Sequence, residues 1–265
     1  MMAGSRTSRF AWLAAGTVFA VASLGWGTYN AVALLAWDRE EFQTTFRVEA
    51  AGDVTTIDVD NDAGSVHIVG SDRDDIVVDG DILQGFQKPT HREEIVGDRL
   101  VLDASCSAVA NFCNVDYEVQ IPRDLDVKVH ASGGGVRISN IDGNLDASSS
   151  GGGVRIEGGR GDMRLRASGG GVRGIGLESP TVDADSSGGG GVRLDFVEEP
   201  RTVVASSSGG GVTVIIPDTR VFYAVDAEAS GGGVSDDIRS DPDSDRSITV
   251  RSSGGGVTVA YPNTE

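Results

Sequence analysis

The stretch Ser132-Gly133-Gly134-Gly135-Val136-Arg137-Ile138 decides how this chain folds, because it returns along the rest of the sequence. The valine that follows the glycines recurs at Val154, Val172, Val192, Val212, Val234 and Val257. The steps between these valines are 18, 18, 20, 20, 22 and 23 residues. A period of about 20 residues, made of short apolar pairs and glycine turns, is typical of a stacked solenoid.

Each copy carries apolar residues at the same four positions, −9, −7, 0 and +2 when the valine is numbered zero. A spacing of two within each pair is typical of a β-strand with one face turned inward. The first glycine copy contributes Val127, Val129, Val136 and Ile138, and an upstream copy with an ordinary corner contributes Ile57, Val59, Val66 and Ile68. We therefore predict an all-β, single-domain β-solenoid over residues 42–265, parallel β-helix-like, with about eight short turns. The return loops add further apolar residues at +5, namely Ile141, Leu177 and Val197.

The glycine content follows from the same repeat. The chain has 38 glycines, and 22 of them lie in the seven Ser-Gly-Gly-Gly-Val corners. We expect glycine there for two reasons: a sharp corner uses positive φ angles, and stacked corners leave no room for Cβ atoms.

The N-terminal residues predict export of everything that follows. Residues 10–37 contain no charged residue, which is long enough for one transmembrane helix. Arg6 and Arg9 precede this segment, so the positive-inside rule places residues 1–9 in the cytoplasm and residues 42–265 outside the cell. We expect an uncleaved, single-pass signal anchor; the alternative is a signal peptide cleaved after Ala33.

Residues 70–122 interrupt the period and are expected to cap one end of the solenoid. Their apolar runs predict strands over 75–80, 99–104 and 115–122, with a polar loop over 84–91. Cys106 and Cys113 are the only cysteines, and in an exported domain they predict a disulfide rather than two free thiols. At the other end, the proline and polar residues of 261–265 are expected to protect the last strand from edge pairing.

These features together resemble a known family. The anchor, the first turn TTIDVDNDAGSVHIVG (55–70), the insertion that ends in VDYEVQIPRDLDV (115–127) and the repeated Gly-x-Val turns are similar to the bacterial putative-adhesin family, a domain of unknown function, here of an actinobacterial type. The resemblance implies a membrane-anchored β-solenoid of the cell envelope. It brings no catalytic residues to this sequence.

The charge balance narrows the choice of partners. Acidic residues outnumber basic ones by 40 to 22, which gives a net charge of −18. Such a surface repels the phosphates of nucleic acids and acidic lipid headgroups, so we expect no nucleic-acid partner.

Two side-chain columns are candidate binding surfaces. Arg137, Arg155, Arg173 and Arg193 stand at +1, and could form a basic stripe for a polyanion such as teichoic acid. The simpler interpretation, which we favour, is a solvated face neutralised by aspartates such as Asp126, Asp146, Asp183 and Asp185. A serine column could present a polar strip to a glycan, but corner hydrogen bonds explain it more simply. Its members are Ser132, Ser150, Ser168, Ser187, Ser208, Ser230 and Ser253.

No other pattern predicts chemistry. Asp241, Asp243 and Asp245 are spaced like calcium ligands, but Arg246 and Ser252 stand where an EF-hand requires glycine and glutamate. The histidines His67, His91 and His130 are scattered, and His67 and His130 should point outward. We therefore predict no catalytic, cofactor-binding or metal-binding residues, no cofactor, and a protein that is not an enzyme.

The sequence thus predicts a non-enzymatic, membrane-anchored extracellular domain that acts as an adhesin-like binding module or surface scaffold. Its partner would be a cell-envelope polymer or a membrane protein. One alternative is an accessory or sensor subunit of an envelope-stress system; a weaker one is a polysaccharide-acting β-helix enzyme. The ligand, the handedness of the solenoid and the oligomeric state do not follow from the sequence.

Overall fold

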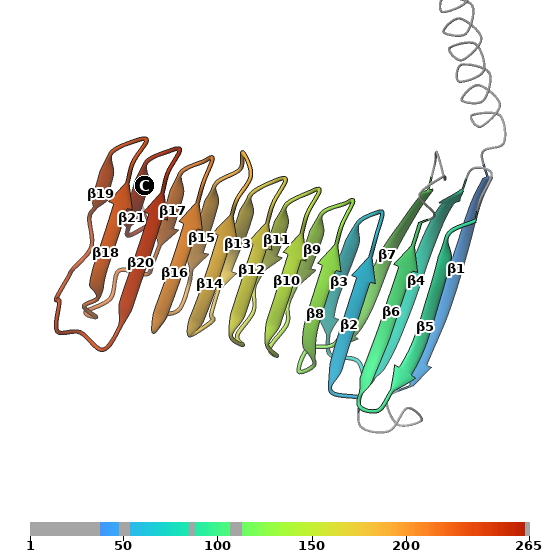
Figure 1. Cartoon of the computed structure of the whole chain (residues 1–265). Helices are drawn as coiled ribbons and strands as arrows, with labels where there is room; N and C mark the ends of the chain where they lie inside the picture. The colour runs from blue at the N-terminus through green and yellow to red at the C-terminus, as the bar shows by residue number, and fades with distance from the viewer. Residues whose placement is uncertain (1–37, 48–53, 85–87, 107–112, 263–265) are drawn as a thin grey trace, which may run out of the picture.

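The computed structural model describes residues 38–47, 54–84, 88–106 and 113–262, and this part of the chain is all-β. Its strands form two sheets, one of eleven strands and one of ten, which face each other along the whole stack (Figure 1). The described residues include no helix that is long and apolar enough to cross a membrane. The predicted cytoplasmic segment 1–9 and transmembrane segment 10–37 lie outside the described residues.

The strand bounds, in spatial order, are as follows. The eleven-stranded sheet contains β1 (Asp38–Arg47), β4 (Asp75–Gln84), β7 (Cys113–Pro122), β3 (Val66–Ser71), β9 (Val136–Ser139), β11 (Val154–Glu157), β13 (Val172–Leu177), β15 (Val192–Phe196), β17 (Val212–Ile215), β21 (Val257–Ala260) and β19 (Val234–Asp236). The ten-stranded sheet contains β18 (Ala224–Ala229), β20 (Ser247–Ser252), β16 (Thr202–Ser207), β14 (Thr181–Ser186), β12 (Met163–Ala167), β10 (Leu145–Ser149), β8 (Asp126–Ala131), β2 (Thr56–Asn61), β6 (Arg99–Ser105) and β5 (Thr90–Val96).

The repeat supplies one strand to each sheet. We call one such pair of strands, with the corner between them, a coil; β10 and β11 form one coil, and β12 and β13 form the next. Equivalent positions of neighbouring coils pair in parallel, so Leu145 lies between Val127 and Met163, and Val154 lies between Val136 and Val172. The step of the sequence repeat is therefore the step from one coil to the next.

The core is a single layer between the two sheets, filled by the positions that the repeat predicts. The strands alternate between buried and outward residues, and Val154 and Ile156 on β11 are 1% and 0% exposed. Of the apolar return-loop residues at +5, Ile141 and Leu177 are buried, whereas the side chain of Val197 is 57% exposed. Strand alternation continues through β15 and turns the neighbouring Phe196 inward instead.

The predicted capping insertion, 70–122, separates into two parts. Residues 99–122 form a further coil, β6 and β7, whose strands pair in parallel with β2 and β3. Leu100, Leu102, Tyr117 and Val119 align with the four apolar positions Ile57, Val59, Val66 and Ile68. The repeat is hidden in the sequence because the corner between Leu102 and Tyr117 is longer than the others.

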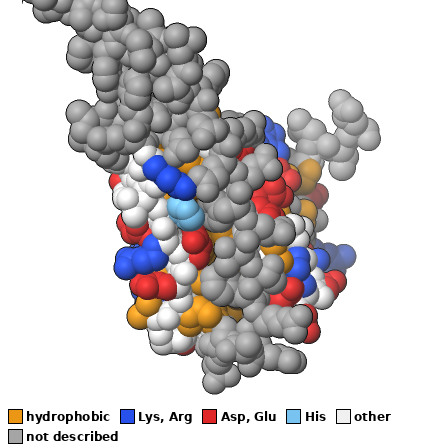
Figure 2. All heavy atoms as spheres, turned by 90° about the vertical axis from the view of Figure 1, so that its right-hand side faces the viewer, with side chains coloured by type: hydrophobic (Ala, Val, Ile, Leu, Met, Phe, Trp, Pro, Cys, Tyr) orange, Lys and Arg blue, Asp and Glu red, His pale blue; other side chains and the backbone are white. Residues whose placement is uncertain are grey.

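The cap itself consists of antiparallel strands. β5 pairs with β6, β4 pairs with β7, and β1 pairs with β4 at the outer edge. β5 was not predicted, and it begins inside the predicted polar loop 84–91. Its charged residues Arg92, Glu93 and Glu94 give no apolar alternation by which a strand could be recognised in the sequence. Charged side chains suit an edge strand, since they discourage pairing with another chain. Acidic and basic side chains gather on the flanks of this end of the stack (Figure 2).

At the other end the last two coils exchange places. β20 lies between β16 and β18, and β21 lies between β17 and β19. The last coil in the sequence, β20 and β21, therefore lies between the two coils that precede it. The expectation that residues 261–265 protect the end of the stack is therefore wrong, because the coil of β18 and β19 is outermost. Its Val234 is 48% exposed, and its Asp236 stands opposite the buried Val259. The coil with the poorer apolar face thus occupies the end.

The glycine corners are required by the close approach of neighbouring backbones. A Cβ on Gly152 would lie 2.7 Å from the Cα of Gly135, and one on Gly210 would lie 2.6 Å from the amide nitrogen of Gly191. Positive φ, the other reason expected for these glycines, is wrong for the triplets, since the described glycines with positive φ lie elsewhere, as at Gly64 and Gly158. Space, and not backbone conformation, selects glycine at the corners.

This conclusion predicts opposite outcomes for two glycines of neighbouring corners. Gly210→Ala should lower the free energy of unfolding by about 1–3 kcal/mol, because the new methyl group overlaps the next backbone. Gly189→Ala is the matched control: no atom lies within 4 Å of the position that its methyl group would take, so it should be neutral or slightly stabilising. Denaturant unfolding of the purified variants measures both, and equal losses would contradict a steric origin.

Candidate functional site

Four arginines form a continuous row on the outer face of the eleven-stranded sheet. Arg137, Arg155, Arg173 and Arg193 lie on four adjacent strands, β9, β11, β13 and β15, and are paired directly in register. His67 on β3 extends the row at one end by pairing with Arg137. Strands in a sheet lie about 4.8 Å apart, so the four arginine Cα atoms span about 14 Å. We call these four residues the arginine row.

The prediction that Asp126, Asp146, Asp183 and Asp185 neutralise this row is wrong. Asp126, Asp146, Asp183 and Asp185 lie on β8, β10 and β14, in the opposite sheet. They precede the corner in their coils, whereas the arginines follow it, and the corner carries the chain from one sheet to the other. Asp183 instead forms ion pairs with Arg164 and Arg166 of its own sheet, at 3.6 and 3.4 Å.

The carboxylates that do reach the arginine row bind alternate members. Arg155 donates a hydrogen bond from Nε to Glu157 Oε1 at 2.5 Å, and Arg193 donates two to Asp195 at 2.9 and 3.0 Å. Arg137 and Arg173 form no ion pair or side-chain hydrogen bond with any residue that the structure describes. Two guanidinium groups, two strands or about 10 Å apart, therefore keep their donors available.

An open groove of about 420 Å³ runs beside the row. Its lining combines basic side chains with residues of the corners, which are mostly glycine. It includes His67, Arg137, Arg155 and Arg173, together with Ser65, Gly135, Gly153 and Gly171. Among the corner residues of the lining, Ser65 alone has a side chain, because the others are glycines.

The row creates a positive field at its own surface. The hydrogen bond from Arg155 and then its charge hold the pKa of the Glu157 carboxyl below its ordinary value, and Arg137 and His67 lower it further. A lowered folded-state pKa means that ionised Glu157 adds stability above its unfolded pKa. This contribution is lost as the pH falls through the folded pKa.

Removal of single arginines should raise that pKa in a graded way. Arg155→Gln should raise the pKa of Glu157 most, because it removes both the hydrogen bond and the nearest charge, and Arg137→Gln should raise it less. Carboxyl NMR resonances followed during a pH titration measure the change. Arg193→Gln, two strands away from Glu157, is the control and should leave the pKa unchanged; a large shift in this variant would contradict the local assignment.

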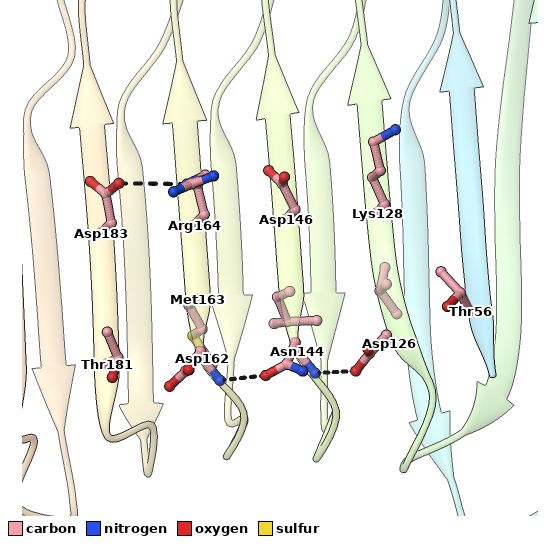
Figure 3. A pocket seen from close by; sticks show the side chains of 12 residues that line it. Thr56, Asp126, Lys128, Asn144, Asp146, Asp162, Met163, Arg164, Thr181 and Asp183 are labelled. Carbon is pink, nitrogen blue, oxygen red and sulfur yellow. Dashed lines mark hydrogen bonds and ion pairs between the residues drawn. The ribbon is translucent and has the colours of Figure 1, made fainter.

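The outer face of the ten-stranded sheet also carries charged side chains in register, but there they are of opposite sign. It holds a groove of about 460 Å³, drawn in Figure 3, in which opposite charges meet across strands. Lys128 Nζ lies 3.6 Å from Asp58 Oδ2, and Arg164 Nε lies 3.6 Å from Asp183 Oδ2. At the start of these strands, the backbone N–H of Asn144 donates to Asp126 Oδ1 at 2.8 Å. The backbone N–H of Asp162 donates to the side-chain oxygen Oδ1 of Asn144 at 3.1 Å. Along one row of this face the charges of Asp58, Lys128, Asp146, Arg164 and Asp183 alternate in sign from strand to strand.

The predicted serine column does not bond the corners with its hydroxyls. Of its seven members, all except the half-buried Ser132 are exposed, and only Ser132 has a side-chain hydrogen bond in the described chain, to His130. The hydroxyls that hold the corners belong to the preceding position, which faces the core: Ser149, Ser186, Ser207 and Ser252. Strand alternation could have identified this position, because it is always small or polar and lies two residues after an inward one.

Ser207 shows how such a hydroxyl acts. It accepts a hydrogen bond from the Gly210 amide at 3.0 Å and donates one to the Gly190 carbonyl of the neighbouring coil at 3.1 Å. One buried group thus fixes its own corner and ties it to the next. Asn61 does the same where the corner is ordinary, donating to the Val115 carbonyl at 2.7 Å.

Two neighbouring serines test this distinction. Ser207→Ala should lower the free energy of unfolding by about 1 kcal/mol, because the Gly210 amide loses its acceptor and the Gly190 carbonyl keeps only the hydroxyl of Ser186. Ser208→Ala, at the exposed position of the same corner, should leave stability unchanged. Thermal or denaturant unfolding measures both, and a larger loss from the Ser208 variant would refute the assignment.

The predicted disulfide is confirmed. Cys106 and Cys113 are bonded, with their Cα atoms 6.0 Å apart. The bond joins the end of β6 to the start of β7, so it closes the one corner that is much longer than the others; such a loop closure contributes about 2–3 kcal/mol.

The remaining candidates form no chemical site. In the chain as described, no group of three or more His, Cys, Asp or Glu side chains is placed to hold a metal ion, and Asp241, Asp243 and Asp245 are exposed. The Asp243 amide donates to Asp241 Oδ1 at 3.0 Å, which closes a local turn. His91 Nδ1 lies 2.9 Å from Glu93 Oε1, which also accepts a hydrogen bond from the Tyr117 hydroxyl. Burial, and then the charge of Glu93, raise the pKa of Tyr117.

The sequence matches no family model and no curated protein. Among solved structures, it is similar to a putative cell adhesion protein from Clostridium sporogenes ATCC 15579, with 14% identity, a TM-score of 0.37, and coverage of 85% of this chain and 100% of that one. It is also similar to putative adhesins from Bacteroides fragilis NCTC 9343 (14% identity, TM-score 0.38, 84% and 97% coverage) and Parabacteroides merdae ATCC 43184 (11%, 0.32, 86% and 96%). These names agree with the family that the sequence resembles, but likeness at this level carries no argument about this chain.

Proposed function

We propose that this protein is a non-enzymatic, adhesin-like binding module of the cell envelope. The observation that carries the proposal is the arginine row: a run of like charges in register, backed by a rigid sheet, on a chain whose net charge is −18. Like charges directly opposite each other across strands destabilise a sheet. Their presence on four successive strands favours a role in binding over a role in folding.

We infer that the stacked coils form a β-solenoid displayed outside the cell by the anchor at 10–37. The positive charges Arg6 and Arg9 before the apolar segment support this orientation. The Cys106–Cys113 disulfide supports export as well, because disulfides persist in oxidising compartments. The partner would then be an envelope polymer or a membrane protein.

Capture of envelope components tests the function. The full-length protein, reconstituted in nanodiscs, is offered separately to peptidoglycan, to anionic polymers and to solubilised membrane proteins. We expect saturable capture of the anionic-polymer fraction, because two members of the arginine row, Arg137 and Arg173, have no carboxylate partner among the described residues. Capture of one membrane protein alone would favour the sensor subunit instead, and no capture at all would refute a binding function.

The proposed orientation in the membrane is tested separately, on cells that express the protein. A tag at the C-terminus should be detected on intact cells, whereas a tag at the N-terminus should be detected only after the membrane is opened. The reverse result would contradict the proposed orientation.

A further inference from the structure

We propose that the arginine row binds a linear phosphodiester polymer, which lies in the adjoining groove along the stack and contacts Arg137 and Arg173. This inference names the ligand class of the site on which the proposed function rests. It begins from the alternation within the row: Arg155 and Arg193 are held by Glu157 and Asp195, whereas the two arginines between and beside them have no carboxylate partner in the described chain.

The outer face of the ten-stranded sheet indicates that the missing carboxylate partners of Arg137 and Arg173 are not a necessary result of the repeat. The ten-stranded sheet is built from the same repeat, and there the charges alternate in sign, so that Asp58 meets Lys128 and Asp183 meets Arg164. The repeat can therefore neutralise a row of charges across neighbouring coils. On the eleven-stranded sheet it does not, and four like charges remain in register.

The direction of approach follows from the surroundings of the row. Glu157 and Asp195 lie on one side of it, two residues after the arginines that they bind. On the other side lie the corner glycines that line the groove, with no side chain to exclude a ligand. Arg137 and Arg173 both line this groove and can turn their donors into it.

The residue type points to phosphate. Arginine presents a planar fork of donors that matches two oxygens of a phosphate, and it remains charged at all accessible pH values. Two such forks about 10 Å apart suit a chain that carries phosphates at intervals, since the second contact then forms at high effective concentration. A single free phosphate gains no such advantage.

The ends of the row and the lining of the groove restrict the ligand further. Glu118 on β7 continues the line of the row beyond His67, so the stretch of polyanion that is bound should end at His67. The groove lining contains no aromatic side chain on which nucleic-acid bases could stack. These features favour a flexible phosphodiester polymer of the envelope over a nucleic acid.

Binding of poly(glycerol phosphate) of defined length to the full-length protein in nanodiscs, measured by titration calorimetry, tests the proposal. The variant Arg137→Gln/Arg173→Gln should weaken binding by about tenfold for each arginine. Binding should also weaken with added salt, and less steeply in the variant, because fewer phosphates are neutralised. Glu157→Gln should strengthen binding, because it frees Arg155.

The matched control is Arg164→Gln/Arg166→Gln, which removes the same charge from the outer face of the other sheet. It should bind as the unaltered protein does. An equal loss in both double variants would overturn the proposal, since attraction would then depend on net charge alone. Equally tight binding of a single-stranded DNA of the same charge would overturn it too. If the polymer does not bind while another envelope fraction is captured, this inference fails and the proposed function stands; if nothing is captured, both fail.

Discussion

The whole stack depends on how closely the backbones of neighbouring corners approach. At Gly152 and Gly210, a single methyl group would overlap backbone atoms of the adjacent coil, so the spacing of the corners matches the spacing of the strands only without side chains. The core then needs little more than a thin layer of Val, Ile, Leu and Ala between the sheets. At four corners a buried serine adds a directional interaction, because its hydroxyl joins two successive corners, as Ser207 does with Gly210 and Gly190.

The repeat predicts what happens within a coil and says little about the order of coils. Inward residues such as Val154 and Ile156 follow from a spacing of two, which is a local property of the backbone. Which coil lies beside which is a global choice, and every coil offers the same edge. At the C-terminal end, the inward residues of the two coils account for their order. Val259 is apolar and is buried between two neighbouring coils, whereas burying Asp236 at the same position would cost free energy. That difference was visible in the sequence, but only a comparison between copies reveals it. The coil of residues 99–122 escaped prediction for another reason, because its long, disulfide-closed corner breaks the count between Leu102 and Tyr117.

In the candidate site, too, local features could be predicted from the sequence, whereas contacts that depend on the arrangement of the sheets could not. The outward direction and the stacking of Arg137 and its equivalents follow from the +1 position, and the structure bears them out. The identity of their counter-ions did not follow, because aspartates near in sequence, such as Asp146, lie across the corner in the other sheet. Residues two positions apart on one strand, such as Arg155 and Glu157, meet instead. In a two-sheet stack, charges must therefore be counted sheet by sheet, because the net charge of the whole chain hides both the arginine row and the alternating charges of the other face.

The residues that occupy the outward +1 position along the stack are informative. This position faces solvent in every coil, so the core places no demand on it. Later coils carry Thr213, Ser235 and Thr258 there, and threonine is both neutral and well suited to a strand. The fold therefore does not need arginine at this position. Arginine nevertheless occupies it in four consecutive coils, where mutual repulsion opposes it, and the run ends abruptly at Thr213. A run of four arginines at a position that also accepts threonine supports the proposed binding role of this row.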